Sequence, residues 1–553
     1  MRLKKRRGVF YTPARLAEIL VAWSVRSSTD LVLEPSFGGC GFIAALHKRF
    51  IEHGTSNPFK NIYGCDVDAY AFKRHLPKAI GKSLDRQHFR KMDFLSVDSS
   101  TFQVGHFNAV LGNPPYVSYH NMFKTQRIAA AAVGNDREFR LSGMASLWAY
   151  FVFHSLKFIK EKGRMAWVLP GSLLHANYAK ELLDELAHRF SRVAVISLSE
   201  RMFLSDGVSE TTEILLCDGY NSARFQGQVE VKQAGNLDIC AALLNDWCTN
   251  GWNGVSLNGR AVPALVGAKE LSAFEAISAT PDVAKLGDVA RISIGIVTGA
   301  NKLFVLREDV AWQRRLPLAG LKPIFAKFSA APGIELTPCD LISAMDRGVP
   351  SLLVDGSKSK KCKTVRLYFA RIPKRFREKN VTFRKHSDWR CPDDNLTPAA
   401  FLSYMHHTGP RLVLNRCGVN ATNTIHRLYF KQNVTYARQK LIAISLLSTF
   451  SQLSAEIEGR SYGAGVLKHE PSEAREIRLI LPKLSARKIN TVFRRVDSVL
   501  RRGLNKKATD IVDRELIAAM YAPPLQTDWG SLRMTLKQLR TRRFRKSKSR
   551  KSR

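Results

Sequence analysis

The tetrapeptide Asn113-Pro114-Pro115-Tyr116 has residue types that indicate a particular chemistry. It follows the apolar run 107–111, which is typical of a buried strand. Consecutive prolines fix the backbone and remove two amide donors, so we expect the carbonyl of Pro114 to face a cleft. Asn113 adds a second carbonyl on its side chain. Two such acceptors suit an amino group, because they bind its N–H bonds and stabilise the charge that develops as it attacks a methyl donor. Tyr116 offers a flat face for a nucleobase.

A glycine-rich turn lies upstream, at Glu34-Pro35-Ser36-Phe37-Gly38-Gly39-Cys40-Gly41-Phe42. Its glycines let the backbone turn sharply and approach a ligand at the start of a helix. Asp66 ends the next strand-like run, where an acidic side chain can hold the hydroxyls of a ribose. Asp93-Phe94 offers an acceptor for an adenine amino group and an aromatic wall. These residues predict a pocket for a nucleoside-bearing ligand. The turn lacks G-x-x-x-x-G-K-[ST], which disfavours an ATP-hydrolysing P-loop.

The elements that position these residues alternate along the first part of the chain. Apolar runs predict strands at 31–33, 62–65, 107–111, 165–169 and 193–196. Amphipathic spacing predicts helices at 41–52, 68–76, 146–160 and 176–189. Such alternation implies parallel βαβ units, and therefore an α/β domain with a doubly wound, mostly parallel sheet over 1–225.

The pattern loosens after residue 225. We interpret 226–280 as a connector and 281–485 as a second, mixed α+β domain. Helical spacing with polar flanks predicts a C-terminal helical segment over 486–530. Residues 531–553 hold eleven positive and no negative side chains, which is typical of a disordered basic tail.

Net charge indicates the partner. The 553 residues carry +39, of which +10 falls on 1–225 and +29 on the remainder. Neutralising phosphates with lysine and arginine releases condensed counterions, so such an excess favours a polyanion. A hydrophobic content of 45% is that of a folded globular chain and excludes a largely disordered one.

Apolar runs, the N-terminal segment and the cysteines bear on where in the cell the protein is expected. The best apolar run, Leu147 to Ile159, is interrupted by His154 and Lys157 and falls short of the roughly 18 residues that a membrane span needs. The basic N-terminus leads into no apolar signal core. The nine cysteines form no C-x-x-C pair, so we expect neither disulfides nor a metal site. We therefore expect a cytoplasmic protein without membrane attachment.

The order of these motifs, beginning at Tyr11-Thr12-Pro13, resembles the gamma-class S-adenosylmethionine-dependent N6-adenine DNA methyltransferases of restriction–modification systems. The resemblance implies a Rossmann-like class I methyltransferase domain. It assigns to the S-adenosylmethionine pocket Thr12, Glu34, Ser36, Gly38, Asp66, Asp93, Phe94 and Pro115. It assigns to the flipped adenine Asn113, Pro114 and Tyr116, with Phe203 as a wedge against the same base. The chain departs from the family at Cys40, where a glycine is usual.

The second half resembles the DNA-recognition domains fused behind such catalytic domains. The resemblance rests on three runs, at 294–304, 423–430 and 462–468. It implies double-stranded DNA as the partner and a cytoplasmic bacterial or archaeal protein that associates with the nucleoid through that DNA. We further expect a monomer, with a separate cognate restriction endonuclease as a possible partner.

Three other functions stay open at this point. The same tetrapeptide would serve a methyltransferase of RNA adenine or of protein glutamine, because their nitrogens need the same acceptors. Asp218 with Glu230-Val231-Lys232 faintly matches the D…E-x-K metal site of a fused restriction nuclease. A DNA-binding protein with a degenerate pocket would not be an enzyme.

Overall fold

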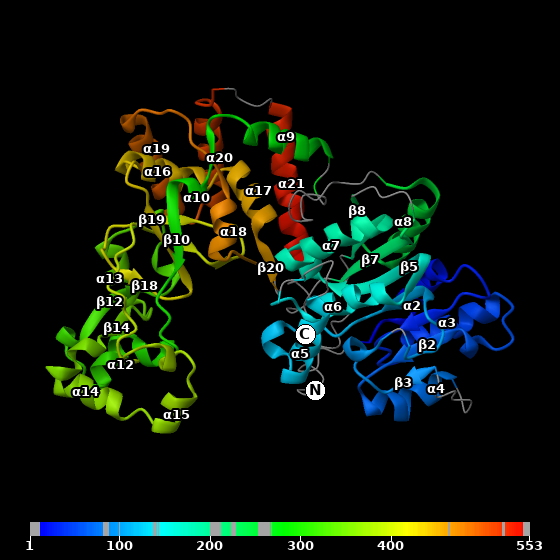
Figure 1. The fold of residues 1–553 in the computed structure, drawn as a ribbon. Coiled ribbons are helices and arrows are strands. Elements are labelled where there is room, and N and C mark those ends of the chain that lie inside the picture. The colour runs from blue at the N-terminus through cyan, green and yellow to red at the C-terminus, as the bar shows by residue number, and fades with distance from the viewer. Residues whose placement is uncertain are drawn as a thin grey trace. The chain divides into compact units, whose positions relative to one another are not determined.

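The chain forms two compact units in the computed structural model. The structure describes residues 11–80, 88–98, 100–135, 141, 143–198, 212–222, 228–252, 266, 268–462, 465–521 and 526–545. Described residues up to Val266 belong to the first unit, and those from 268 to Arg545 belong to the second (Figure 1). Within these ranges no helix combines the length and the apolar character that crossing a bilayer requires.

The first unit is built on an eight-stranded sheet in the order β3-β2-β1-β4-β5-β7-β6-β8. All neighbouring pairs are parallel except those of β7, which is antiparallel to both β5 and β6. The strands are β1 (Val32–Glu34), β2 (Ile62–Cys65), β3 (Phe89–Arg90), β4 (Phe107–Gly112), β5 (Ile159–Pro170), β6 (Phe190–Leu198), β7 (Thr212–Tyr220) and β8 (Val229–Ala234).

Helices cover both faces of this sheet because successive strand residues point to opposite sides. Val32 packs in a core with α2, α3 and α8, and Leu33 packs in a second core with α6 and α7. The helices are α2 (Ala14–Ser24), α3 (Gly41–Glu52), α4 (Leu76–Ile80), α5 (Lys124–Gly134), α6 (Leu147–His154), α7 (Asn177–Arg189) and α8 (Leu237–Asn250). The doubly wound, mostly parallel sheet predicted from the sequence is therefore confirmed.

The second unit is mixed α+β. Its largest sheet has the order β10-β19-β15-β17-β13, and a second has the order β11-β14-β12-β18. Strands of these sheets are β10 (Ala290–Ile294), β11 (Val305–Leu306), β12 (Leu321–Phe325), β13 (Glu335–Leu336), β14 (Leu352–Val354), β15 (Ala400–Ser403), β17 (Leu412–Asn415), β18 (Asn420–Ala421) and β19 (Ile425–Phe430). Smaller sheets pair β16 (Met405–His406), β20 (Arg460–Tyr462) and β21 (Val466–Lys468), and β9 (Val283–Lys285) with β22 (Arg478–Ile480).

Helices of the second unit gather mainly toward its C-terminal part. They are α9 (Ala268–Ser278), α10 (Leu286–Val289), α11 (Asn301–Phe304), α12 (Glu308–Gln313), α13 (Pro338–Asp346), α14 (Lys363–Ala370), α15 (Lys374–Lys379), α16 (Tyr436–Ser445), α17 (Thr449–Glu458), α18 (Pro471–Glu476), α19 (Ala486–Arg501), α20 (Asn505–Ile517) and α21 (Gln526–Arg545).

The structure corrects the interpretation of 226–280 as a connector. β8 pairs in parallel with β6 and extends the first unit's sheet. α8 buries Cys240, Leu244 and Trp247 against the same unit. α9 belongs instead to the second unit. The strand signal at 229–234 is weak because the alternation of apolar and polar residues breaks at Gln233 and a glycine lies near each end of the run.

The structure also corrects the disordered tail over its first part, because 531–545 continue helix α21. Leu532 and Leu536 are buried in the second unit. Arg540 and Arg543 bind the buried carboxylate of Glu456, at 3.2 and 2.6 Å. The positive charge that suggested disorder is here neutralised by a partner more than 80 residues away, which composition does not reveal. Residues 546–553 lie outside the described residues.

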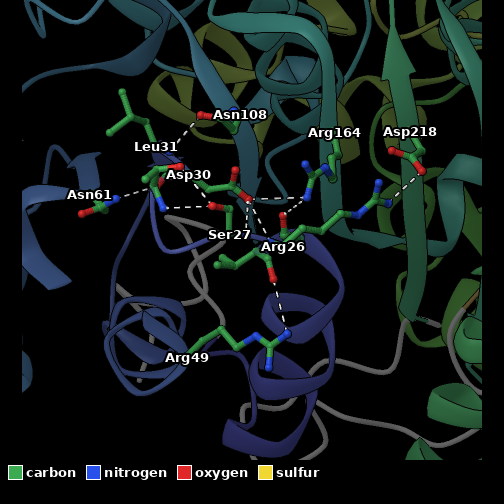
Figure 2. A network of polar contacts seen from close by, with 12 residues as sticks. Arg26, Ser27, Asp30, Leu31, Arg49, Asn61, Asn108, Arg164 and Asp218 are labelled. Carbon is green, nitrogen blue, oxygen red and sulfur yellow. Dashed lines mark hydrogen bonds and ion pairs between the residues drawn. The ribbon is translucent and has the colours of Figure 1, made fainter. Parts of the chain in front are cut away.

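A polar network fixes the amino-terminal end of β1 (Figure 2). The Asp30 carboxylate accepts hydrogen bonds from the backbone N–H groups of Arg26 and Ser27, at 2.9 and 3.3 Å. It also lies 3.6 Å from the guanidinium of Arg164, which is 8% exposed and donates to the carbonyl of Ser24. The side-chain Oδ1 of Asn108 accepts a hydrogen bond from the backbone N–H of Leu31 at 2.9 Å. The network therefore joins the start of β1 to β4 and β5.

We expect Asp30→Ala to lower the free energy of unfolding by about 3–5 kcal/mol, because it leaves the buried Arg164 guanidinium without its carboxylate. Urea unfolding followed by circular dichroism measures this. Glu18→Ala is the control, since its pairs with Arg15 and Lys48 are exposed and should contribute less than about 1 kcal/mol. Equal losses in the two variants would contradict the structural role of Asp30.

Candidate active site

The predicted site residues converge because four neighbouring parallel strands end at the same edge of the sheet. Glu34 is the last residue of β1, and Asn113 directly follows β4. Asp66 directly follows β2, and Asp93 comes three residues after β3. A cavity of about 420 Å³ opens beyond these strand ends. This edge is where open α/β sheets bind ligands.

The cavity brings together most of the residues singled out in the sequence. Those that line it are Thr12, Glu34, Ser36, Gly38, Asp66, Asp93, Phe94, Asn113 and Pro115. Pro114 and Tyr116 are adjacent in sequence but are not among the lining residues. Phe203 lies outside the described residues.

Glu34 is a buried carboxyl group on the cavity wall, with 2% of its surface exposed. The backbone N–H of Ile43, in the first turn of α3, bonds to it, whereas its Oε2 meets no hydrogen-bond partner among the described residues. Burial, reinforced by the nearby Asp66, raises the pKa of Glu34 well above its ordinary range. An oxygen that is buried without a partner next to a cavity is well suited to a ligand that brings its own N–H groups or positive charge.

Asp66 ties the glycine-rich turn to the end of β2. One carboxylate oxygen accepts from the backbone N–H of Gly38 at 2.8 Å, and the other accepts from that of Asp68 at 2.7 Å. Burial raises the pKa of Asp66, and these backbone hydrogen bonds oppose the rise. Its carboxylate is therefore held in a fixed orientation at the cavity.

The turn needs glycine at two positions for different reasons. Gly38 has φ +43°, a left-handed conformation in which side chains are strained. At Gly39 a Cβ atom would lie 2.3 Å from the ring of Tyr11, so the absence of a side chain lets that ring pack against the turn. Cys40 also adopts the left-handed conformation, with φ 60° and ψ 24°, immediately before α3. A glycine would hold this conformation without strain, and the buried Cys40 side chain packs in the core of α2 and α3 instead.

Asp93 and Phe94 form another wall. The Asp93 side chain accepts from the backbone N–H of Leu95 at 3.1 Å, which caps a short helical turn. Phe94 is 1% exposed and packs against Phe151 of α6, with ring centroids 5.3 Å apart. Asp93 and Phe94 therefore stand side by side in the cavity wall.

Asn113 is held from two sides. Its side-chain Nδ2 donates to the Thr12 hydroxyl at 3.2 Å, and its backbone carbonyl accepts from the Ser36 hydroxyl at 3.3 Å. The bond to Thr12 engages Nδ2 and so fixes the orientation of the Asn113 amide. Its Oδ1 then points away from Thr12. No local pattern indicates the contact between Asn113 and Thr12, because the two residues lie 101 positions apart.

The remaining residues of the tetrapeptide are fixed by the neighbouring backbone. The Tyr116 hydroxyl donates to the carbonyl of Val168, in β5, at 3.0 Å. The carbonyl of Pro115 accepts from the backbone N–H of Val117, whereas no backbone N–H of a described residue donates to that of Pro114. Pro114 is buried and does not line the cavity, so the orientation of its carbonyl toward the cleft stays a prediction.

Several lining residues were missed in the sequence. Phe123, Gln126 and Phe151 all contribute to the cavity. Phe123 is 60% exposed and immediately precedes α5, so it stands at the rim of the cavity. No local pattern marks these residues, because they come from helices and loops that only the folded sheet brings together.

The residues of the nuclease alternative are engaged in ion pairs. Asp218, in β7, accepts from Arg26 at 2.8 Å (Figure 2). Glu230, in β8, accepts from the backbone N–H of Trp252 at 2.6 Å and lies 3.6 Å from Arg192. Across the described residues no group of three or more His, Cys, Asp or Glu side chains is arranged to hold a metal. Asp218 and Glu230 therefore hold neighbouring elements against strands β7 and β8.

We expect Glu34→Gln to raise the free energy of unfolding at neutral pH in the absence of ligand. The unfolded chain ionises Glu34 above about pH 4.3, whereas burial opposes its ionisation in the folded chain, so native Glu34 becomes more destabilising as pH rises. The stability advantage of the variant should therefore be larger at pH 8 than at pH 5. Urea unfolding at both pH values tests this, with the exposed Glu52→Gln as control. An advantage that is unchanged between the two pH values would contradict the assigned burial.

Comparison with known families covers both units. Residues 1–237 match a family described as N-6 DNA Methylase. Residues 258–517 match the family "Type II methyltransferase M.Eco57I, C-terminal domain". The two matches follow the division of the structure into units.

Individual relatives are distant but extend over most of the chain. Type II methyltransferase M.AccI of Acinetobacter calcoaceticus is 20% identical over 479 residues, covering 85% of this chain and 84% of the relative. M.XamI of Xanthomonas campestris pv. amaranthicola is 23% identical over 487 residues, covering 86% and 85%.

A solved structure shares the fold of this chain. The Type IIL restriction–modification enzyme MmeI in complex with DNA is 11% identical, with a TM-score of 0.51, and the match covers 96% of this chain and 75% of that one. The first unit combines the doubly wound, mostly parallel sheet expected from the sequence with a match to the N-6 DNA Methylase family. The chain therefore joins a domain that matches the N-6 DNA Methylase family to a domain that matches the C-terminal domain of a type II methyltransferase.

Proposed function

We propose that this chain transfers a methyl group from S-adenosylmethionine to the N6 amino group of an adenine extruded from duplex DNA at a specific site. One observation carries the proposal. Asn113 presents its oriented amide at the same cavity that holds the unpartnered carboxyl oxygen of Glu34.

The cavity residues fit S-adenosylmethionine, which the fold and the family imply. A volume of about 420 Å³ falls in the range of about 300–1,000 Å³ typical of small-molecule sites. Oε2 of Glu34 suits an ammonium group, and the oriented carboxylate of Asp66 suits ribose hydroxyls. Asp93 and the ring of Phe94 suit the adenine part. When bound there, the compound would supply a methyl group on a positively charged sulfur.

The chain's own contribution is to hold the target amine. Oδ1 of Asn113 and the carbonyl of Pro114 accept the two N–H bonds of an exocyclic amine and orient its nitrogen toward the cavity. Acceptors fixed in advance also stabilise positive charge that develops on that nitrogen, without reorganisation during the reaction. Tyr116, anchored to the backbone of β5, provides a stacking face close by.

A base in a duplex cannot reach such a cavity, so the target nucleotide must leave the stack, at a cost of a few kcal/mol. The net +29 of residues 226–553 favours binding of the flanking phosphates and helps to offset that cost. Under this proposal the chain acts as a monomer in the cytoplasm, beside a separate restriction endonuclease.

We expect Asn113→Ala to lower kcat for DNA methylation at least about 100-fold, because one of two fixed acceptors is lost. Transfer of labelled methyl groups to duplex DNA, followed by nucleoside analysis, measures this. Binding of S-adenosylmethionine by calorimetry is the control and should persist. Label on RNA or on protein glutamine but not on DNA adenine would overturn the proposed substrate, as would full activity of the variant.

We expect Thr12→Val to lower kcat about tenfold, because the acceptor that orients the Asn113 amide is removed at nearly constant shape. Thr12→Ser keeps the hydroxyl and should restore most of the activity. The readout is the separation of kcat from the Kd for S-adenosylmethionine. A valine variant that weakens cofactor binding but leaves kcat unchanged would show that Thr12 serves only the pocket wall.

A further inference from the structure

We propose that the second unit carries a preformed surface that binds the phosphate backbone of DNA without reading its sequence. We call it the basic surface and define it by the exposed lysines and arginines of residues 358–385. The proposal rests on the proposed DNA substrate and adds to it a located interface and a mode of contact.

Positive charge is concentrated in this segment of the second unit. Residues 358–385 hold twelve lysines and arginines and one acidic residue, Glu378. Eleven of the cations are exposed: Lys358, Lys360, Lys361, Lys363, Arg366, Arg371, Lys374, Arg375, Lys379, Arg384 and Lys385.

Intramolecular partners do not account for these cations. Among the described residues, the one ion pair that involves them joins Lys374 to Glu378, at 3.8 Å and with both side chains mostly exposed. Exposed cations elsewhere in the same unit are paired more closely, as in Lys488–Glu515 at 2.6 Å and Arg533–Asp510 at 3.1 Å. Uncompensated like charges repel one another, and a polyanion relieves that repulsion.

Helix α14 shows that the charge is presented on one face. Val365 and Phe369 are buried in the core of this part of the unit. Lys363, Arg366 and Arg371 are exposed, at spacings of three and five residues that place them away from that core. The helix therefore directs its cations outward from a packed base, in contrast to a flexible tail whose ordering would oppose binding.

The rest of the segment is also held in place. Trp389 stacks on the buried Phe383, with ring centroids 4.8 Å apart and an interplanar angle of 22°. Asn380 donates to the carbonyl of Gly299 at 3.1 Å. Gly299 has φ +70°, and a Cβ atom there would lie 2.7 Å from Thr382. The glycine-containing run 294–304, noted in the sequence, thus seats the segment against the unit.

Neighbouring residues extend the surface. Arg314, which follows α12, donates to the Tyr368 hydroxyl at 2.5 Å, and Tyr368 in turn donates to the carbonyl of Leu303. Figure 1 shows α12, α14 and β14 together in this part of the second unit. Leu367 and Phe376 are 47% and 45% exposed between the cations. Apolar side chains placed among cations suit the sugar-phosphate chain, whose sugars are less polar than its phosphates.

The kind of cation favours phosphate over base edges. Seven of the eleven exposed cations are lysines, which act as point charges, and only four are arginines, whose rigid planar fork gives the more geometrically specific contacts. Contacts of this type position a protein on DNA and carry no sequence information themselves. We therefore expect the basic surface to contribute affinity and salt dependence, with the choice of site made elsewhere.

The test combines Lys363→Gln, Arg366→Gln and Arg371→Gln in the full-length chain. Glutamine keeps helix propensity and length while removing three charges. Each lost phosphate contact should lower the slope of log Kd against log salt concentration by about one, so the slope of the triple variant should fall by about three. The variant should also bind DNA more weakly at low salt. The matched control replaces the exposed Arg502, Lys506 and Lys507, on and near α20, with glutamine.

The outcomes separate the possibilities. The proposal predicts a reduced salt slope and a raised KM for DNA in the α14 variant alone, with the methylated sites, the thermal unfolding midpoint and S-adenosylmethionine binding unchanged. Equal effects in the control variant would overturn it, because only net charge would then matter. A change in the methylated sequences would also overturn it, by assigning base readout to α14. If neither protein methylates DNA adenine, the proposed function fails, while the salt slope of DNA binding still tests the surface.

Discussion

The parallel register of β3, β2, β1 and β4 is the constraint on which the site depends. Parallel pairing brings the carboxyl ends of these strands to one edge, so an acidic or amide residue at each end reaches the same cavity. The network around Asp30 fixes the opposite end of β1 against β4 and β5. A shift of β1 by one residue would exchange Val32 and Leu33 between two different cores, so the register is fixed by burial on both faces.

The cavity retains features that oppose stability. Glu34 is buried with an oxygen that meets no partner among the described residues, and Cys40 stands in a left-handed conformation that favours glycine. Each is unfavourable for the folded chain by itself. Both border the turn that faces the cavity, where a ligand could supply the missing contact. The surrounding cores of α2, α3 and α6 hold the strained turn in place.

Positive charge serves two different purposes in the second unit. Along α21 the guanidinium groups of Arg540 and Arg543 are paired with Glu456 and help to hold a helix against its neighbours. Along α14 the exposed cations stand on a packed base without such partners. By composition alone the two segments look the same. The buried Glu456 gives the cations of α21 a structural role, whereas the cations of α14 remain available to an external anion.

The sequence by itself determined the first unit's fold class and most of the cavity wall. Strand periodicity and glycine chemistry are local, so α3 was placed at its observed residues, and strands β1, β2 and β4 were found within one residue at either end. Nine of the site residues indicated by the motifs and by the family resemblance line the cavity.

Only the tertiary structure decided the contacts made at long range. The bond from Asn113 to Thr12, the packing of Tyr11 over Gly39 and the pairing of β8 with β6 join segments that no local pattern relates. The helical state of 531–545 was likewise hidden, because it depends on the buried Glu456 rather than on the residues of the helix alone. Local propensity determines whether a segment is a helix or a strand. Burial and charge pairing between distant residues determine where that element packs.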